Sequence, residues 1–144
     1  MQQRSFKRDP ALKYERGTRG RGDHMTASLY ERLGGEKGIT QLVNDMIDAY
    51  LVNPVIKTRF ENVADLDNAK RITVEYLCAN SGGPQAYTGQ DMITRHTGMN
   101  ISEQEFMAVV DDILGAMDKN NLGEDEKKEI LAYVWSIKGE VIRL

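Results

Sequence analysis

One histidine, placed after a glycine-rich turn, is the residue of this chain best suited to metal chemistry. The turn reads Gly82-Gly83-Pro84-Gln85-Ala86-Tyr87-Thr88-Gly89, and Met92 and His96 follow it. Neutral imidazole is the commonest metal ligand among side chains. The 144 residues hold two histidines, and His24 lies in the first 24 residues. His96 is therefore the candidate metal ligand, with an exposed loop histidine as the alternative.

Other kinds of metal or covalent site lack the residues they need. A single cysteine, Cys78, excludes an intrachain disulfide and a Cys-based zinc cluster. The carboxylates at Asp111-Asp112 and at 124–129 have no second histidine to join them, which argues against a metal-dependent hydrolase. No apolar run reaches the length of a membrane span, and no signal-peptide core follows the start. We therefore expect a soluble, cytoplasmic protein.

The first 24 residues differ in composition from the rest. Seven of the 19 basic residues and three of the 22 acidic residues lie there, giving this segment +4 and the remainder −7. With no apolar repeat it cannot offset its chain entropy, so a disordered arm is predicted. Three origins stay open: a vector-derived or upstream segment before a true start at Met25, a native solvated tail, or an arm that binds nucleic acid or a membrane surface.

The remainder is predicted to be all-helical, because no alternating strand pattern exceeds a few residues. A short helical turn at 29–33 stops at Gly34-Gly35, and Pro54 is expected to open another short helix near Phe60. The longer predicted helices carry apolar residues at the spacing of one buried face. They span residues 36–51, 66–80, 102–120 and 124–141. The last is expected to bury Ile130, Leu131, Val134, Ile137 and Val141.

The connection between residues 81 and 101 is predicted to be mostly irregular. Gly82-Gly83-Pro84 ends the preceding helix, because glycine permits positive φ and proline cannot continue a helix. Only residues 90–96 are expected to be helical, which puts Met92 and His96 on one face. A capping box at Ser102–Glu105 starts the next helix. A bundle built only for stability needs no such connection, so we expect this space to hold something else.

These residues resemble a truncated haemoglobin, the two-on-two globin class, and most closely its group I. The resemblance covers residues 28 to about 141, and its most specific element is Gly-Gly-Pro-x-x-Tyr-x-Gly with the methionine and histidine at their offsets. The other matching positions are Tyr30, Leu33, Gly34, Gly35, Phe60, Ile101 and Phe106. The resemblance implies an all-α, truncated globin-like two-on-two helical sandwich over residues 25–144, with a mostly irregular proximal segment.

Carried over residue by residue, the resemblance implies haem b with His96 as the proximal iron ligand. Met92 would line the proximal side one turn before the ligand. Other positions are expected in the haem pocket: Phe60, Ala69, Thr73 and Leu77 on the distal side, and Tyr87, Ile101 and Phe106 at the macrocycle or its edge. The alternative is that these side chains are ordinary core residues.

The distal side departs from the family's pattern. Oxygen-binding relatives carry a Phe-Tyr pair in the second helix, and ungapped alignment puts Met46-Ile47 there and Thr73 at the position of a common distal glutamine. Tyr50 lies one turn later and reaches inward only if the helix shifts. The Thr73 hydroxyl could donate, but a bond to the Ala69 carbonyl competes. A hydrogen-bond donor stabilises bound O₂ by roughly 1–3 kcal/mol. Because the tyrosine donor is missing here, we predict a less polar pocket with fast O₂ release and relatively strong CO and NO binding.

The sixth coordination site of the iron is expected to be open. With one histidine outside the first 24 residues, ligation by two histidines is excluded unless that segment folds back. Lys70 or Met46 would be the alternative ligands. Cys78 is expected to be a small buried hydrophobe rather than a thiolate ligand.

The leading functional hypothesis is therefore reversible binding of O₂, CO or NO by a histidine-ligated haem. Three alternatives stay open: NO dioxygenase-type detoxification with a reductase partner, a haem-based gas sensor that signals through a partner, and a haem-free interaction module. Whether the protein is an enzyme is left undecided. No nucleic-acid partner and no membrane span are expected, and a monomer or weak dimer is predicted.

Overall fold

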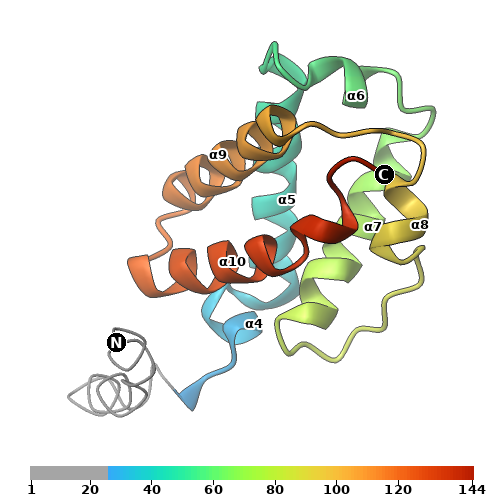
Figure 1. Cartoon of the computed structure of the whole chain (residues 1–144). Coiled ribbons are helices and arrows are strands. Elements are labelled where there is room, and N and C mark those ends of the chain that lie inside the picture. Colours follow the sequence, from blue (N-terminus) through green and yellow to red (C-terminus); the bar gives the residue numbers. More distant parts are fainter. Residues whose placement is uncertain (1–25) are drawn as a thin grey trace, which may run out of the picture.

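The computed structural model describes residues 26–144, and its regular structure is helical (Figure 1). The elements are α4 (Leu29–Arg32), α5 (Gly35–Val52), α6 (Lys57–Glu61), α7 (Leu66–Asn80), α8 (Met92–His96), α9 (Glu103–Lys119), α10 (Glu124–Ser136) and the 3₁₀ turn η1 (Lys138–Glu140). Within these residues the sole β contact is an isolated bridge between Ile101 and Ile142. The all-α prediction is confirmed; the expectations for residues 1–24 and for Met25 lie outside the described residues.

Helix α5 is the centre of the packing, since both α7 and α9 lie against it and α10 packs on α9 (Figure 1). Its apolar residues fall three or four apart, which brings them onto one face of the helix. That face is buried through Ile39, Leu42, Val43, Met46, Ile47 and Tyr50. Removing this surface from water supplies the main driving force for assembling the helices.

Local sequence sets where the principal helices begin. The Ser102 hydroxyl accepts from the Glu105 amide at 3.1 Å, while the Glu105 carboxylate accepts from the Ser102 amide at 3.4 Å. This is the predicted capping box, and it starts α9. Asp65 caps α7 by accepting from the Asn68 amide at 3.0 Å. The predicted bounds of α7, Leu66–Asn80, match the observed ones.

Two short helices begin later than predicted. Helix α6 starts at Lys57 and not at Pro54, because Asn53 first organises a turn. The Asn53 side chain accepts from the Val55 amide at 3.1 Å, and its carbonyl accepts from Lys57 at 2.8 Å. Helix α8 starts at Met92 and not at residue 90, since the intervening aspartate is its N-cap.

The last helix is shorter than predicted. It ends at Ser136 and not at residue 141, and the chain continues through η1. Leu131, predicted to be buried, is 42% exposed. Val141 is buried as predicted, but it reaches the core after the chain has turned, at a position that lets Ile142 bridge to Ile101. The apolar spacing therefore continued across a real break in the helix.

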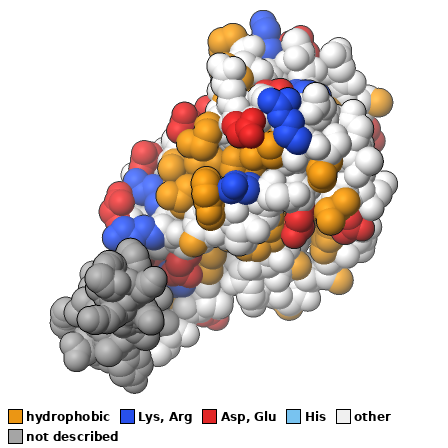
Figure 2. All heavy atoms as spheres, viewed as in Figure 1, with side chains coloured by type: hydrophobic (Ala, Val, Ile, Leu, Met, Phe, Trp, Pro, Cys, Tyr) orange, Lys and Arg blue, Asp and Glu red, His pale blue; other side chains and the backbone are white. Residues whose placement is uncertain are grey.

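Hydrophobic side chains gather over α9 and α10 on the face seen in Figure 2. Met107 of α9 and Leu131 and Trp135 of α10 are among the exposed large hydrophobic residues. The Lys138 ammonium lies 4.4 Å from the Trp135 ring centre. In the described part of the chain, no helix is long and apolar enough to cross a membrane.

Candidate functional site

A mainly apolar cavity of about 550 Å³ lies among helices α5 to α10. It receives side chains from all six helices and from the irregular segments on either side of α8. The volume falls within the roughly 300–1,000 Å³ of typical cofactor pockets. The connection between residues 81 and 101, predicted to be irregular, supplies part of this wall.

The structure brings every predicted site residue to this cavity. Its lining includes His96, Met92, Phe60, Ala69, Thr73, Leu77, Tyr87, Ile101, Phe106, Met46 and Ile47. They come from five helices and two loops, so their meeting depends on the fold and not on sequence proximity. What the structure adds is their arrangement around one space.

His96 is held by a hydrogen bond within its own helix. Its Nδ1 lies 2.8 Å from the carbonyl oxygen of Met92. Because a carbonyl can only accept, Nδ1 must carry the proton, and the neutral ring then has its lone pair on Nε2. Nε2 makes no hydrogen bond within residues 26–144. The ring is thereby set up to offer Nε2 to a metal ion at the cavity wall.

Helix α8 is short and depends on its cap. The Asp91 carboxylate accepts from the Thr94 amide at 2.8 Å and from the Thr94 hydroxyl at 3.0 Å. These donors lower the pKa of Asp91, with the amide as the largest cause. Since the helix spans five residues, this cap fixes the direction in which His96 leaves the backbone.

The glycine-rich turn packs tightly against α4 and α7. Gly82 has a left-handed φ of 100°, and a Cβ on Gly83 would lie 2.6 Å from the Tyr30 ring. Further along, the Thr88 amide and hydroxyl donate to the Glu75 carboxylate at 3.0 and 2.7 Å. Both donors lower the pKa of Glu75, the hydroxyl most. These contacts hold the loop that carries Tyr87 against α7.

The distal wall is apolar near the predicted ligand positions. Met46 and Ile47 are 5% and 3% exposed. The Thr73 hydroxyl donates to the Ala69 carbonyl at 2.8 Å, the competing bond considered from the sequence. Its only proton is therefore already committed.

Tyr50 also lines the cavity, although the sequence suggested that it would face inward only after a shift of the helix. Its ring stacks on Phe60, with centroids 4.7 Å apart and planes at 29°. Burial raises the pKa of the Tyr50 hydroxyl, and the Asp112 carboxylate adds to the effect. Within the described residues the hydroxyl has no hydrogen-bond partner.

Three further tyrosines meet at the cavity. Tyr76 of α7 and Tyr133 of α10 are hydrogen-bonded through their hydroxyls, and Tyr87 packs edge-on against Tyr76 with centroids 5.1 Å apart. The Tyr87 hydroxyl donates to the Gln90 carbonyl at 2.5 Å. Sequence reasoning missed Tyr76 and Tyr133 as site residues. The helical spacing of Tyr76 from Thr73, and of Tyr133 from Ile130, could have found them.

Charged side chains stand at the cavity beside two of the predicted residues. Arg59 precedes Phe60, and its Nε lies 2.6 Å from the Glu105 carboxylate. Arg95 precedes His96, and no ion pair to it occurs in the part of the chain that the structure describes. No sequence pattern distinguished these two arginines from surface residues.

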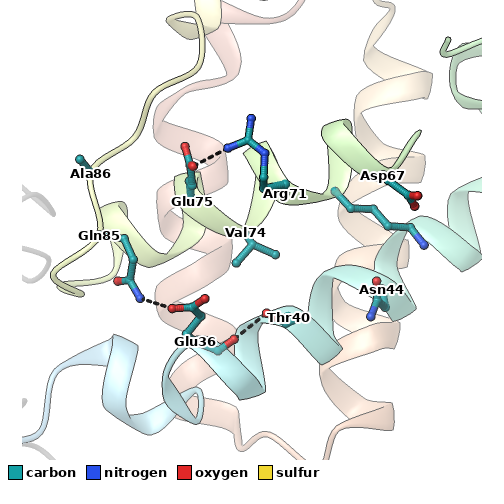
Figure 3. Close-up of a pocket in the computed structure, with 10 residues that line it drawn as sticks. Glu36, Thr40, Asn44, Asp67, Arg71, Val74, Glu75, Gln85 and Ala86 are labelled. Carbon is teal, nitrogen blue, oxygen red and sulfur yellow. Dashed lines mark hydrogen bonds and ion pairs between the residues drawn. The ribbon is translucent and has the colours of Figure 1, made fainter. Parts of the chain in front are cut away.

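A second pocket of about 560 Å³ lies between α5 and α7 and contains none of the predicted site residues (Figure 3). Glu36, Arg71 and Glu75 are among its charged residues, and Gln85 donates to Glu36 at 3.0 Å. Lys70, one of the two alternative sixth ligands, lines this polar pocket and is not among the residues that line the apolar cavity, whereas Met46 is. Cys78 is fully buried, as predicted, and burial raises the pKa of its thiol.

Residues 26–144 contain no group of three or more His, Cys, Asp and Glu side chains that could hold a metal ion. A single histidine ligand in an apolar cavity suits a metal whose other ligands come from an organic ring, as in haem. The donor set therefore fits a haem and does not fit a bare cation.

Comparison with known proteins agrees with this geometry. A group 1 truncated haemoglobin of Tetrahymena pyriformis is 29% identical over 90 residues, covering 62% of this chain and 74% of the relative. One from Nostoc sp. (strain MUN 8820) is 24% identical over 116 residues, covering 81% and 98%.

Solved structures share the fold. The Fe(III) form of the Tetrahymena pyriformis truncated haemoglobin aligns with a TM-score of 0.78 at 23% identity, covering 82% of this chain and all of that one. A group II truncated haemoglobin of Bacillus anthracis aligns with a TM-score of 0.73 at 21% identity, covering 81% and 92%.

Residues 28–143 match the family described as bacterial-like globin. This match covers nearly all of the described structure, and it agrees with the helix order, the cavity and the single histidine. The chain therefore belongs to the bacterial-like globins, the truncated haemoglobin family, and membership implies a haem cofactor.

Proposed function

We propose that the apolar cavity binds haem b through His96 and that the protein reversibly binds O₂, CO or NO on the iron. The observation that carries the proposal is the bond from His96 Nδ1 to the Met92 carbonyl at 2.8 Å, which leaves Nε2 available at the wall of the cavity. Membership of the family supports the gas ligands.

The lining offers a distinct role to each kind of side chain. Met92 and Phe60 would contact the two faces of the ring, while Tyr87, Ile101 and Phe106 would contact its edge. The two haem carboxylates need cations, and Arg95 and Arg59 stand at the cavity. Arg59 would share its charge with Glu105, whereas Arg95 has no ion pair in residues 26–144 to give up.

The bound haem would supply an iron that binds a diatomic gas. The side chains around the iron would set the rate at which that gas dissociates. Bound O₂ carries partial negative charge, so a hydrogen-bond donor slows its loss. Met46 and Ile47 have no donor, and the Thr73 proton is committed to the Ala69 carbonyl. The Tyr50 hydroxyl is the remaining donor at this wall, and we propose that stacking of its ring on Phe60 keeps it from the bound gas. We therefore expect fast O₂ release, and relatively strong binding of CO and NO, which depend less on a donor.

The test is the absorption spectrum of haem-loaded protein in its ferric, ferrous and ferrous-CO forms, beside His96→Gly. The unmutated protein should give a five-coordinate ferrous spectrum with a histidine-type CO complex. His96→Gly should lose both, and added imidazole should restore them by occupying the vacated position. Ile93→Ala is the matched control on α8, because that side chain is 53% exposed and does not line the cavity.

Two results would overturn the proposal. A chain that holds no haem would leave a globin-shaped interaction domain. A His96→Gly protein that keeps the unmutated spectrum without imidazole would assign the iron to another ligand.

A further inference from the structure

The Tyr76–Tyr133 pair lies between the cavity and the solvent. Tyr76 belongs to α7 and Tyr133 to α10, and both line the cavity. Their hydroxyls are hydrogen-bonded to each other, and their ring centroids lie 6.2 Å apart at 53°. Both side chains are only partly buried, so the pair also reaches solvent.

Gas binding gives this pair no task. Neither residue is one of the predicted distal positions, and packing alone would be served by phenylalanine. Burial raises the pKa of the Tyr76 hydroxyl, and the hydrogen bond to Tyr133 adds to this, so the Tyr76 phenol keeps its proton at neutral pH. Two neutral phenols in contact can each give up one electron together with one proton.

We propose that Tyr76 and Tyr133 are the electron donors when a haem in this cavity meets hydrogen peroxide, and that they become joined by a carbon–carbon bond. The proposal rests on the haem binding proposed above. It assigns the protein a peroxide-consuming activity and a self-modification site that gas binding does not require.

The reaction balances with one peroxide for each pair. The O–O bond breaks, and hydrogen peroxide takes up two electrons and two protons to become two water molecules. Each phenol supplies one electron and its hydroxyl proton. The two rings then couple at carbons next to their hydroxyls, and the hydrogens on those carbons move to the oxygens to restore both phenols.

Geometry favours this pair over other tyrosines. Two phenols that share a hydrogen bond hold the carbons beside their hydroxyls close together. Tyr87 packs edge-on against Tyr76, but its hydroxyl is turned to the Gln90 carbonyl. Tyr50 stacks on a phenylalanine, which cannot couple with it in this way.

The experiment treats haem-loaded ferric protein with one equivalent of hydrogen peroxide at low protein concentration. Electron paramagnetic resonance is recorded on samples frozen within seconds, and the protein is then digested with trypsin for mass spectrometry. Trypsin releases residues 72–95, which hold Tyr76 and Tyr87, and residues 129–138, which hold Tyr133. The expected product joins these two peptides and is lighter than their sum by two hydrogen atoms.

Variants identify the donors. Tyr76→Phe and Tyr133→Phe keep the rings and should each abolish the linked peptide and at least halve the tyrosyl radical signal. Tyr87→Phe should retain the link, since it leaves the pair intact. Tyr30→Phe, a tyrosine outside the cavity, is the matched control and should behave like the unmutated protein.

Each failure has its own meaning. Haem-loaded protein that reacts with peroxide but forms no linked peptide, or forms one that survives in Tyr76→Phe, overturns this inference and leaves gas binding in place. A chain whose absorption spectrum records no bound haem overturns both proposals.

Discussion

The Thr73 hydroxyl donates its proton to the Ala69 carbonyl, 2.8 Å away and one turn earlier in α7. A threonine at this position would otherwise be the nearest candidate to stabilise bound O₂ from the distal helix. Because of this bond, the Thr73 hydroxyl has no free proton to donate to a bound gas. The proposed ligand kinetics can therefore be tested by substitution.

Thr73→Val should change the O₂ dissociation rate by less than about threefold, because the lost hydroxyl was already engaged. Ile47→Tyr should slow dissociation about ten- to hundredfold, since a new donor would stabilise bound O₂ by about 1–3 kcal/mol. Stopped-flow displacement of O₂ by CO measures both rates. A large acceleration in Thr73→Val would mean that the hydroxyl leaves Ala69 when ligand binds. An unmutated protein that releases O₂ as slowly as Ile47→Tyr would contradict the apolar pocket.

Glu105 offers a test of pH dependence at the cavity rim. The Arg59 guanidinium beside it and the Ser102 amide hold the pKa of Glu105 below its ordinary 4.5. A lowered pKa in the folded state adds stability above the ordinary value, and this stability is lost as pH falls through the lowered pKa. Glu105→Gln keeps an oxygen for the capping box but removes the ion pair.

We expect Glu105→Gln to lower the free energy of unfolding at neutral pH by about 1 kcal/mol or less, the range for partly exposed pairs. The difference from the unmutated protein should begin to shrink as pH falls below 4.5 and should vanish once pH lies below the lowered pKa of Glu105. Urea unfolding at stepped pH, with the haem content held constant, measures this. Ser102→Ala is the control: its loss of about 1 kcal/mol comes from the helix cap and should persist in acid. If the loss of stability in Glu105→Gln also persisted in acid, it could not come from the ion pair with Arg59.

Gly83 illustrates why the glycine-rich turn needs its composition. A Cβ there would lie 2.6 Å from the Tyr30 ring and from Gln85 Oε1, and the Tyr30 hydroxyl is itself held by the Glu36 amide at 3.1 Å. We expect Gly83→Ala to lower the free energy of unfolding by about 1–3 kcal/mol through overpacking.

The matched control for this substitution is Gly115→Ala in α9. Nothing lies within 4 Å of a Cβ at Gly115, so alanine there should stabilise the helix by up to about 1 kcal/mol. Urea unfolding of both variants measures the two effects. Equal stability of Gly83→Ala and the unmutated protein would mean that the turn shifts without cost.

Sequence patterns predicted the helices well where burial was one-sided and caps were strong. Helix α7 matched at both ends, since Asp65 caps its start and Ser81-Gly82-Gly83 ends it. The end of α10 was wrong, because apolar spacing alone cannot distinguish a continuing helix from a turn that delivers Val141 to the same core. Pro54 misled in a similar way, since the Asn53 turn precedes the helix.

The site was predicted unevenly for a related reason. Its predicted residues carried a family pattern, and the structure brought them to one cavity. Tyr50, Tyr76 and Tyr133 carried none, and their place depends on how α5, α7 and α10 rotate about their axes in the assembled fold. Arg95 could not be predicted as a site residue, because an arginine next to a histidine is equally common on a solvent-exposed helix surface.

The cavity is lined by residues of two hydrophobic clusters. Leu42 and Ile47 of its wall belong to one cluster, and Ile101 and Phe106 belong to the other. A haem seated there would contact both clusters, and a free haem concentration of a hundred times the dissociation constant would add about 2.7 kcal/mol of stability. Empty chains would then unfold more often and be degraded sooner than filled ones. The cell's haem supply would in this way influence the amount of protein that accumulates, independently of the rate of its synthesis.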